Sequence, residues 1–98
     1  PQAHAMALFH ICQEALANTA KHSQARRVDV RLWTTRDRVL LEVADNGLGF
    51  DLRKMSVTIG HGLSNMHVRA RKVRGDVEIT SAPGEGTTVL AWVPRRED

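Results

Sequence analysis

Residues 45–50, with the sequence DNGLGF, combine a carboxylate with two glycines spaced by one residue. They follow an apolar run, residues 39–44, which predicts a buried strand. A carboxylate at the end of a buried strand is costly without partners, and glycines let a backbone approach another group closely. We therefore expect Asp45 to accept a hydrogen bond from a ligand that lies over Gly47 and Gly49. A plain surface turn would use the same residues, because Asp-Asn-Gly is strong turn chemistry by itself.

A second group of residues with chemical potential lies near the start of the chain. His10, Glu14, Asn18 and Lys21 are separated by steps of four, four and three residues, which place them on one face of a helix. An amide oxygen suits Mg²⁺, an ammonium group suits phosphate, and a carboxylate can act as a base or orient a water molecule. The spacing thus indicates a site for a metal-bound phosphate compound. An ordinary solvated helix face would show the same spacing.

Two further glycines, Gly60 and Gly62, flank His61 just before Leu63. Residues 51–61 show no helical period, so we expect a long loop that acts as a lid and closes at these glycines. A helix that starts at about Leu63 would offer its free amides to a phosphate. A simple junction between loop and helix would need the same glycines. His22 and His61 lie next to the expected ligand elements and could support the groups that bind the ligand.

The elements that must position these residues follow from apolar periodicity. Residues 4–22 predict a first helix, residues 26–35 and 38–45 a hairpin with a turn at 35–37, and residues 76–81 and 87–94 two further strands. The second helix should end at Gly75 as a C-cap. Alternation in both hairpin strands predicts one buried face, and Asp45 shares the parity of that face in its strand. The expected apolar stripe of the first helix is Ala5, Leu8, Cys12, Ala15, Leu16 and Thr19.

Composition bounds the protein class. The 98 residues predict one small domain, and 42% hydrophobic and 26% charged residues are ordinary globular values. No apolar run approaches the length of a membrane span, and Cys12 has no second cysteine to pair with. The net charge of +3 favours anionic ligands only mildly. The basic run at residues 69–74 leaves a nucleic-acid contact as an alternative, although basic groups also suit a helix C-terminus.

Four apolar residues share the outward parity of their strands: Trp33, Leu40, Leu90 and Trp92. If these strands are neighbours, the four side chains form a patch that a partner domain or a second copy covers. Scattered surface apolar residues would be the alternative.

Four motifs in fixed order cover nearly the whole chain: QEALANTAKH at 13–22, DNGLGF at 45–50, GHGLSNM at 60–66 and GEGTT at 84–88. They resemble the N, G1, G2 and terminal glycine-threonine boxes of the ATP-binding catalytic domain of bacterial sensor histidine kinases. This domain belongs to the Bergerat-type ATPase superfamily of gyrase, heat-shock chaperones and mismatch-repair proteins. The detailed form is most similar to the nitrate-sensor subfamily. The resemblance implies an α+β fold, a two-layer sandwich with helices on one face of a mixed, mostly antiparallel sheet.

The resemblance also implies roles for individual residues. Asp45 would bind the adenine amino group, directly and through a water molecule that Thr87 also holds. Asn18 would hold Mg²⁺ against the phosphates, Lys21 would meet a phosphate, and Glu14 would help activate the attacking histidine. Gly47 and Gly49 would let the base approach the backbone, and Gly60 and Gly62 would hinge the lid. The backbone amides near Leu63 would face the phosphates.

The function implied is Mg²⁺-dependent transfer of the ATP γ-phosphoryl group to a histidine on a separate dimerisation domain, with a response regulator downstream. The whole kinase would be homodimeric and this domain cytoplasmic, with no nucleic acid as a partner. Since the strand that usually precedes the first helix and the phosphoacceptor domain are missing, we expect residues 1–98 to be a catalytic fragment. His10 stands where this subfamily more often has Arg, so its phosphate contact is open. The alternatives are an anti-sigma-factor-type serine kinase and a non-catalytic nucleotide-sensing module.

Overall fold

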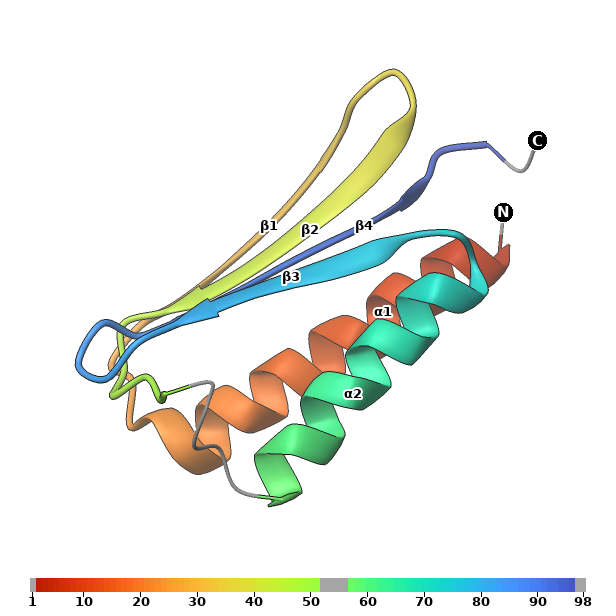
Figure 1. Ribbon diagram of the computed structural model, residues 1–98. Helices are drawn as coiled ribbons and strands as arrows, with labels where there is room; N and C mark the ends of the chain where they lie inside the picture. The colour runs from red at the N-terminus through yellow and green to blue at the C-terminus, as the bar shows by residue number, and fades with distance from the viewer. Residues whose placement is uncertain (1, 52–56, 97–98) are drawn as a thin grey trace.

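The computed structural model describes residues 2–51 and 57–96 (Figure 1). The elements follow in the order α1 (Gln2–Asn18), a short π-helical segment η1 (Thr19–Ser23), β1 (Val28–Thr34), β2 (Arg38–Asp45), α2 (Val57–Lys72), β3 (Asp76–Ser81) and β4 (Thr87–Pro94). Among the described residues, neither helix combines the length and the apolar character needed to cross a bilayer.

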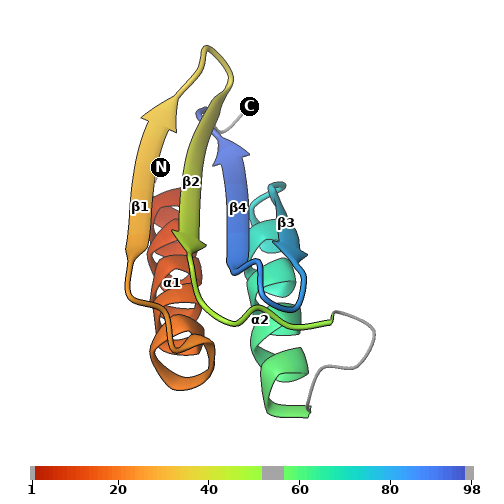
Figure 2. The same ribbon diagram turned by 90° about the vertical axis from the view of Figure 1, so that its left-hand side faces the viewer.

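The strands form one sheet in the order β1-β2-β4-β3, and each neighbouring pair is antiparallel. Both helices cover the same face, and the other face carries no element of the described chain (Figures 1 and 2). α1 contacts β2 and β4, whereas α2 contacts β3 and β4. The predicted α+β two-layer sandwich is therefore confirmed, although the described strands form a purely antiparallel sheet rather than the predicted mixed one.

The core lies between the two layers and is built from aliphatic side chains and one methionine. On the helix side it depends on Leu8, Ile11 and Ala15 of α1 and on Met66 and Ala70 of α2. The sheet contributes one face of β2, β3 and β4: Leu41, Val43, Val77, Val89, Ala91 and Val93. The stripe predicted for the first helix was partly wrong, because Ile11 is fully buried and Leu16 remains 37% exposed.

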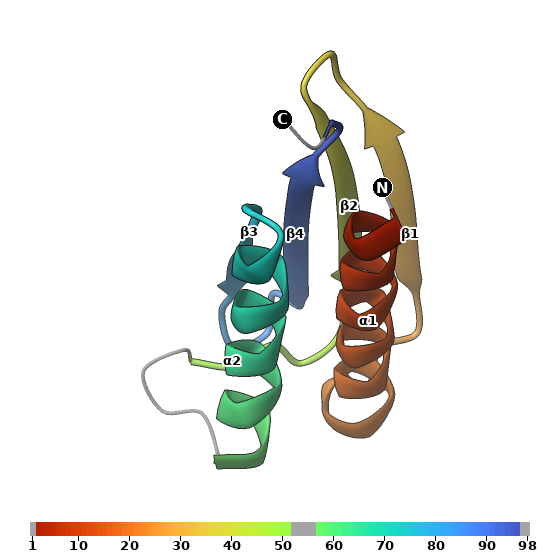
Figure 3. The ribbon, with the colours of Figure 1, turned by 90° about the vertical axis from the view of Figure 1, so that its right-hand side faces the viewer.

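The predicted hairpin of β1 and β2 is confirmed, and its pairing runs from Val28 opposite Asp45 to Thr34 opposite Val39. The prediction that β1 has a buried face was wrong. Val28, Val30 and Leu32 are 39%, 48% and 66% exposed. The alternation correctly predicted which side of β1 continues the core-facing side of β2. That side of β1 stays open because α1 lies over β2 and β4 (Figure 3).

α2 begins at Val57, six residues before the predicted start at Leu63. Gly60, His61 and Gly62 therefore lie inside the helix, and the predicted loop end at these glycines was wrong. The first four amides of a helix lack intrahelical partners, and Leu63 is the seventh residue of α2. The amide of Leu63 is thus not a free amide of the helix start. Residues 52–56, the centre of the predicted lid, lie outside the described residues.

α2 ends in a Schellman motif whose left-handed residue is Arg74, with φ 64°. The Gly75 N–H donates to the Ala70 carbonyl at 2.8 Å and the Arg74 N–H to the Arg71 carbonyl at 3.1 Å. Sequence had placed the cap at Gly75. Gly75 is needed for another reason, because a side chain there would overlap the Trp92 carbonyl oxygen of β4.

Candidate functional site

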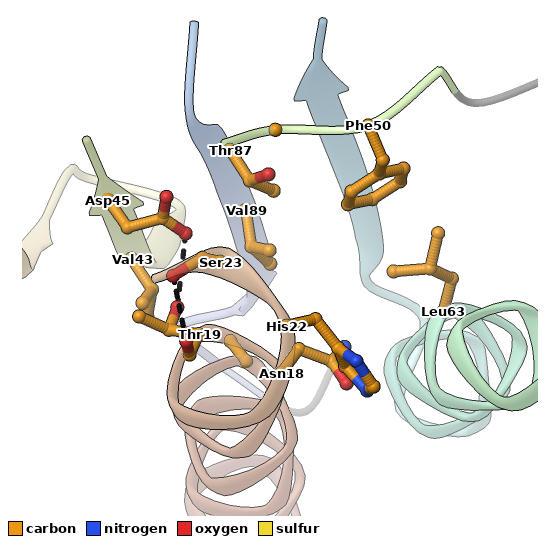
Figure 4. A pocket seen from close by; sticks show the side chains of 12 residues that line it. Asn18, Thr19, His22, Ser23, Val43, Asp45, Phe50, Leu63, Thr87 and Val89 are labelled. Carbon is orange, nitrogen blue, oxygen red and sulfur yellow. Dashed lines mark hydrogen bonds between the residues drawn. The ribbon is translucent and has the colours of Figure 1, made fainter. Parts of the chain in front are cut away.

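A pocket lies at the end of the molecule where β2 ends, β4 begins and α1 passes into η1 (Figure 4). Leu63 of α2 and Phe50 close it from the other side (Figure 4). The complete lining is Ala15, Asn18, Thr19, His22, Ser23, Val43, Asp45, Gly49, Phe50, Leu63, Thr87 and Val89. Five of the predicted site residues thus meet Leu63 in one place: Asn18, His22, Asp45, Gly49 and Thr87.

Asp45 is the last residue of β2, and its carboxylate turns toward the helix layer, as its parity predicted (Figure 4). One oxygen, Oδ1, accepts a hydrogen bond from the Gly47 N–H at 2.9 Å, and the other, Oδ2, accepts one from the Thr19 hydroxyl at 3.1 Å. A carboxylate has about four acceptor sites. Asp45 is therefore held in place by two hydrogen bonds and retains acceptor capacity for a ligand.

The pocket wall beside Asp45 is the π-helical turn η1, which widens the end of α1. The Ser23 hydroxyl donates to the Thr19 carbonyl at 2.7 Å and accepts from the Ala25 N–H at 3.1 Å. Gln24 then leaves the helix in a left-handed conformation, with φ 51°. Isolated π-turns are frequent at functional sites because they reorient one side chain relative to the helix. Here the turn places Thr19 within reach of Asp45.

The two glycines of residues 45–50 admit the protein's own backbone. A side chain at Gly47 would overlap the Ser23 carbonyl, and the Leu48 N–H donates to that same carbonyl at 2.7 Å. Gly49 has φ 65°, and a side chain there would overlap the Ala82 carbonyl. These contacts fix the segment after Asp45 against η1 and the β3–β4 turn. The predicted role of both glycines in admitting a base remains a prediction.

A chain of hydroxyl groups forms the sheet side of the pocket. The Ser81 hydroxyl accepts from the Phe50 N–H at 2.9 Å, donates to the Gly86 carbonyl at 3.0 Å, and lies 2.8 Å from the Thr87 hydroxyl. Because a serine has one hydroxyl hydrogen, Thr87 must be the donor in this last contact. The Thr87 oxygen consequently faces the pocket as an acceptor.

The free space inside the pocket is small, about 30 Å³. That volume holds one or two water molecules and is too small for a purine. A base can therefore enter only if the groups that close the pocket, Phe50 and Leu63 among them, move apart.

Glu14 does not line this pocket. It lies one helical turn before Asn18, in a groove between α1 and α2 that Gln13, His10, Asn65 and Arg69 also line. Both Glu14 and Asn18 approach Gly62, since a Cβ at Gly62 would lie 3.3 Å from Glu14 Cδ and 3.3 Å from Asn18 Nδ2. Gly62 therefore permits α2 to pass close to these two side chains.

Besides Glu14, five predicted site residues lie outside the pocket lining: Lys21, Gly47, Gly60, His61 and Gly62. Lys21 and His61 are exposed side chains, and a Cβ at Gly60 would meet no atom within 4 Å. Lys21 lies in η1, beside the pocket-lining His22. The phosphate contact of Lys21, the hinge role of Gly60 and the supporting role of His61 stay predictions.

Sequence reasoning missed four residues that hold the site: Thr19, Ser23, Ser81 and Asn46. The Asn46 side chain accepts from the Arg26 and Arg27 N–H groups, both at 3.0 Å, and ties the start of β1 to the end of β2. Thr19 had been assigned to the apolar stripe. Only the small polar side chains near the motifs hinted at these contacts, because their partners are distant in sequence.

Comparison with known proteins gives consistent results. Residues 3–97 match the family described as the histidine kinase-, DNA gyrase B- and HSP90-like ATPases. The sensor protein VraS of Staphylococcus haemolyticus is 39% identical over 92 residues, which cover 93% of this chain and 26% of VraS. The sensor histidine kinase LiaS of Bacillus subtilis is 39% identical over 87 residues, which cover 89% of this chain and 24% of LiaS.

The signal transduction histidine-protein kinase/phosphatase DegS of Bacillus subtilis is 38% identical over 91 residues and covers 91% of this chain and 24% of DegS. The chain thus spans about a quarter of the length of these relatives. The histidine kinase domain of a blue-light-activated kinase from Erythrobacter litoralis has the same fold, with a TM-score of 0.76, 19% identity, and coverage of 96% of this chain and 46% of that one. The chain belongs to the family of histidine kinase-, DNA gyrase B- and HSP90-like ATPases.

Proposed function

We propose that this chain is the ATP-binding catalytic unit of a sensor histidine kinase. It binds Mg²⁺-ATP and transfers the γ-phosphoryl group to a histidine on a separate dimerisation domain. The observation that carries the proposal is the position of Asp45. Its carboxylate ends a core strand, is fixed by Thr19 and Gly47, and keeps acceptor capacity inside a partly apolar pocket. The similarity to sensor kinases supports the reaction class.

The adenine end of the ligand fits the Asp45 side of the pocket. The exocyclic amino group donates two hydrogens, and Asp45 accepts one of them directly. A water molecule accepts the second and donates its own hydrogens to Asp45 and to Thr87. The acceptor state of the Thr87 oxygen, set by its donation to Ser81, supports this arrangement. Val43, Val89 and Phe50 provide apolar contact for the ring.

The phosphate end of the ligand fits the side of Asn18. No group of three or more His, Cys, Asp or Glu side chains able to hold a metal occurs among the described residues. This suits Mg²⁺, which usually takes one or two protein ligands beside phosphate oxygens and water. Asn18 supplies one neutral oxygen, and the ion, when bound, neutralises phosphate charge. Lys21, exposed on the neighbouring turn, is placed to meet a phosphate once the pocket opens.

Glu14 acts on the phosphoacceptor. Its groove adjoins Asn18 at Gly62 and is lined by residues of the two helices, α1 and α2. An imidazole that enters the groove donates its N–H to the Glu14 carboxylate and directs its other nitrogen at the γ-phosphorus. Binding and transfer are thus separate tasks of neighbouring residues. The acceptor domain, a response regulator and a cytoplasmic location follow from the proposed reaction, as does a homodimeric whole kinase.

Two measurements test the proposal. Calorimetric titration should show binding of Mg²⁺-ATP and ADP, with weaker ATP binding in the presence of a chelator. Radiolabelled ATP should then label a histidine of a separately produced dimerisation domain from a relative such as LiaS. Glu14→Gln should keep ATP affinity and lose most of the transfer, whereas Asp37→Asn in the exposed hairpin turn serves as the control. Binding without any transfer would favour a nucleotide-sensing module, and absence of binding would overturn the proposal.

A further inference from the structure

The sheet face opposite the helices carries the apolar cluster that the strand parity predicted. Trp33 of β1 pairs with Leu40 of β2, and Leu40 pairs with Trp92 of β4. Leu90 precedes Trp92 by two residues on the same face. The four side chains therefore form one patch, the outer-face patch, on the side of the sheet that no described element covers (Figure 1).

Two arginines stack on the tryptophans of this patch. The Arg38 guanidinium lies 3.8 Å from the ring centre of Trp92, and the Arg31 guanidinium lies 4.9 Å from that of Trp33. Trp and Arg are enriched at the centres of protein–protein interfaces, where aromatic surface and a rigid donor fork contribute most per residue. The composition of the patch is typical of an interface rather than of a solvated sheet face.

A positive side chain, Arg38, and a negative side chain, Glu78, lie on opposite sides of Trp92. Arg38 pairs with Pro94, two residues after Trp92, and Glu78 pairs with Leu90, two residues before it. Arg38 and Glu78 thus lie diagonally across Trp92, on the two strands that flank β4. Among the described residues, neither has an ion-pair partner, whereas Arg31 pairs with Glu42 at 3.5 Å.

We infer that a second copy of this chain packs on the outer-face patch with twofold symmetry. An axis that lies in the interface plane and passes over Trp92 exchanges the positions of Arg38 and Glu78. Each Arg38, stacked on its own Trp92, then faces Glu78 of the other copy, and the two Arg38–Trp92 stacks lie at the centre. Self-complementarity of this kind is the requirement for a symmetric dimer contact, and it distinguishes a second copy from an unrelated partner. The contact leaves the helix layer and the nucleotide pocket free.

The two tryptophans provide a direct probe, because the chain has no other tryptophan and no tyrosine. Sedimentation velocity over a concentration series should show a monomer–dimer equilibrium. Over the same series, the tryptophan emission should shift to shorter wavelength as the dimer forms. A chain that stays monomeric up to millimolar concentration would overturn the inference and favour another domain of the kinase as the occupant.

Charge reversal tests the proposed pairing. Arg38→Glu and Glu78→Arg should each weaken dimerisation by at least tenfold, because one substitution disrupts both symmetric pairs. The double variant in one chain restores complementarity and should regain most of the affinity. Arg26→Glu and Glu85→Arg, exposed positions away from the patch, are matched controls and should leave the dimer unchanged. A dimer that ignores both single reversals, or that forms without any change in tryptophan emission, would place the contact elsewhere and contradict the inference.

Discussion

At the scale of single residues, the proposed ligand contacts of Asp45 and Asn18 come from different layers, the sheet and the helices. Asp45 is positioned by hydrogen bonds to Thr19 and Gly47 that exist without a ligand. Asn18 lies on the last turn of α1, where a Cβ at Gly62 would lie 3.3 Å from its amide nitrogen. Preorganised groups lower the ordering cost of binding. Substitutions at these two residues should therefore affect affinity more than fold.

Asp45→Asn should weaken binding of ATP and ADP by about ten- to a hundredfold. The amide keeps the shape of the side chain but accepts more weakly, and a hydrogen bond to a charged group contributes roughly 1.5–3 kcal/mol. The loss should be the same for both nucleotides because they share adenine. Purine riboside triphosphate, which carries a hydrogen in place of the exocyclic amino group, should bind wild type and variant nearly equally.

Calorimetry with the three nucleotides measures these differences, and Asp37→Asn in the exposed hairpin turn is the matched control. If Asp45 were only a turn residue, Asp45→Asn would cost a little stability and no affinity. Equal ATP affinities of wild type and variant would remove the adenine contact from Asp45.

Asn18→Ala should reduce the contribution of Mg²⁺ to ATP affinity by about tenfold, which corresponds to ~1.4 kcal/mol. Loss of one protein ligand matters for an ion that uses only one or two. The measurement is ATP affinity with Mg²⁺ and with chelator, for wild type and variant. The variant should match wild type when metal is removed. A variant whose affinity responds to Mg²⁺ as wild type does would take Asn18 out of the metal site.

At the scale of elements, the sequence determined the strands better than the helices. The bounds predicted for β3 and β4 agree with the structure, because alternation is clear and Pro83, Gly84 and Gly86 mark the turn between them. The start of α2 was missed because Gly60 and Gly62 have poor helix propensity, which tertiary packing overrode. Burial of β1 was misjudged because alternation tells which side is apolar, not whether a helix covers it.

The same distinction applies to the candidate site. The direction of Asp45 followed from the period of its own strand, so it could be predicted. The contacts of Thr19 with Asp45 and of Ser81 with Thr87 join separate elements, and no local period encodes them. The π-turn of η1 depends on backbone hydrogen bonding at the end of α1 and has no sequence signature of its own.

The end of α2 offers a test of backbone conformation in two neighbouring residues. Arg74→Gly should leave stability unchanged or raise it by up to about 1 kcal/mol, because Arg74 has φ 64° and glycine adopts that conformation without strain. Gly75→Ala should destabilise by about 2 kcal/mol or more, since its Cβ would overlap the Trp92 carbonyl. Urea unfolding of both variants measures the difference. An opposite order of stabilities would contradict the assignment of the left-handed residue.

The junction of α2 with β3 predicts a pH dependence of stability. The Val77 N–H lowers the pKa of Asp76 most, partial desolvation opposes it, and Arg71 and His67 lower the pKa further. A carboxylate whose pKa is lower in the folded state stabilises the fold above its unfolded-state pKa and loses that contribution as pH falls through its folded pKa. Asp76→Asn should therefore be less stable than wild type at pH 7.

The difference between wild type and Asp76→Asn should shrink as the pH falls below about 4, the usual pKa of aspartate. Thermal unfolding from pH 7 to pH 3 gives this comparison, with Asp29→Asn, a carboxylate paired with Arg27 at the opposite edge of the sheet, as control. A difference that stays constant over this range would show that the charge of Asp76 is not the cause.

At the scale of the whole molecule, the functions lie on different surfaces. The nucleotide pocket occupies one end of the sandwich, the groove with Glu14 lies between the helices, and the outer-face patch lies on the opposite side of the sheet. In the proposed arrangement, a phosphoacceptor reaches the nucleotide from the helix side while a second copy covers the sheet. This separation lets ATP binding, phosphoryl transfer and self-association be measured independently.

The isolated chain should bind ATP and yet form no stable phosphohistidine. Transfer needs an imidazole in line with the γ-phosphorus, about 3–3.5 Å away. Of the five histidines, His22 lines the pocket from η1, and His10 lines the groove with Glu14 from α1. We expect neither to accept the phosphoryl group, because the proposed acceptor is a histidine of a separate domain. Incubation with radiolabelled ATP, followed by acid and alkali treatment, distinguishes phosphohistidine from phosphoserine, and His10→Gln and His22→Gln report on the two candidates. Stable label on the wild-type chain that disappears in either variant would show that the chain carries its own acceptor, whereas label that appears only when the separate dimerisation domain is added agrees with a catalytic unit that acts on a partner.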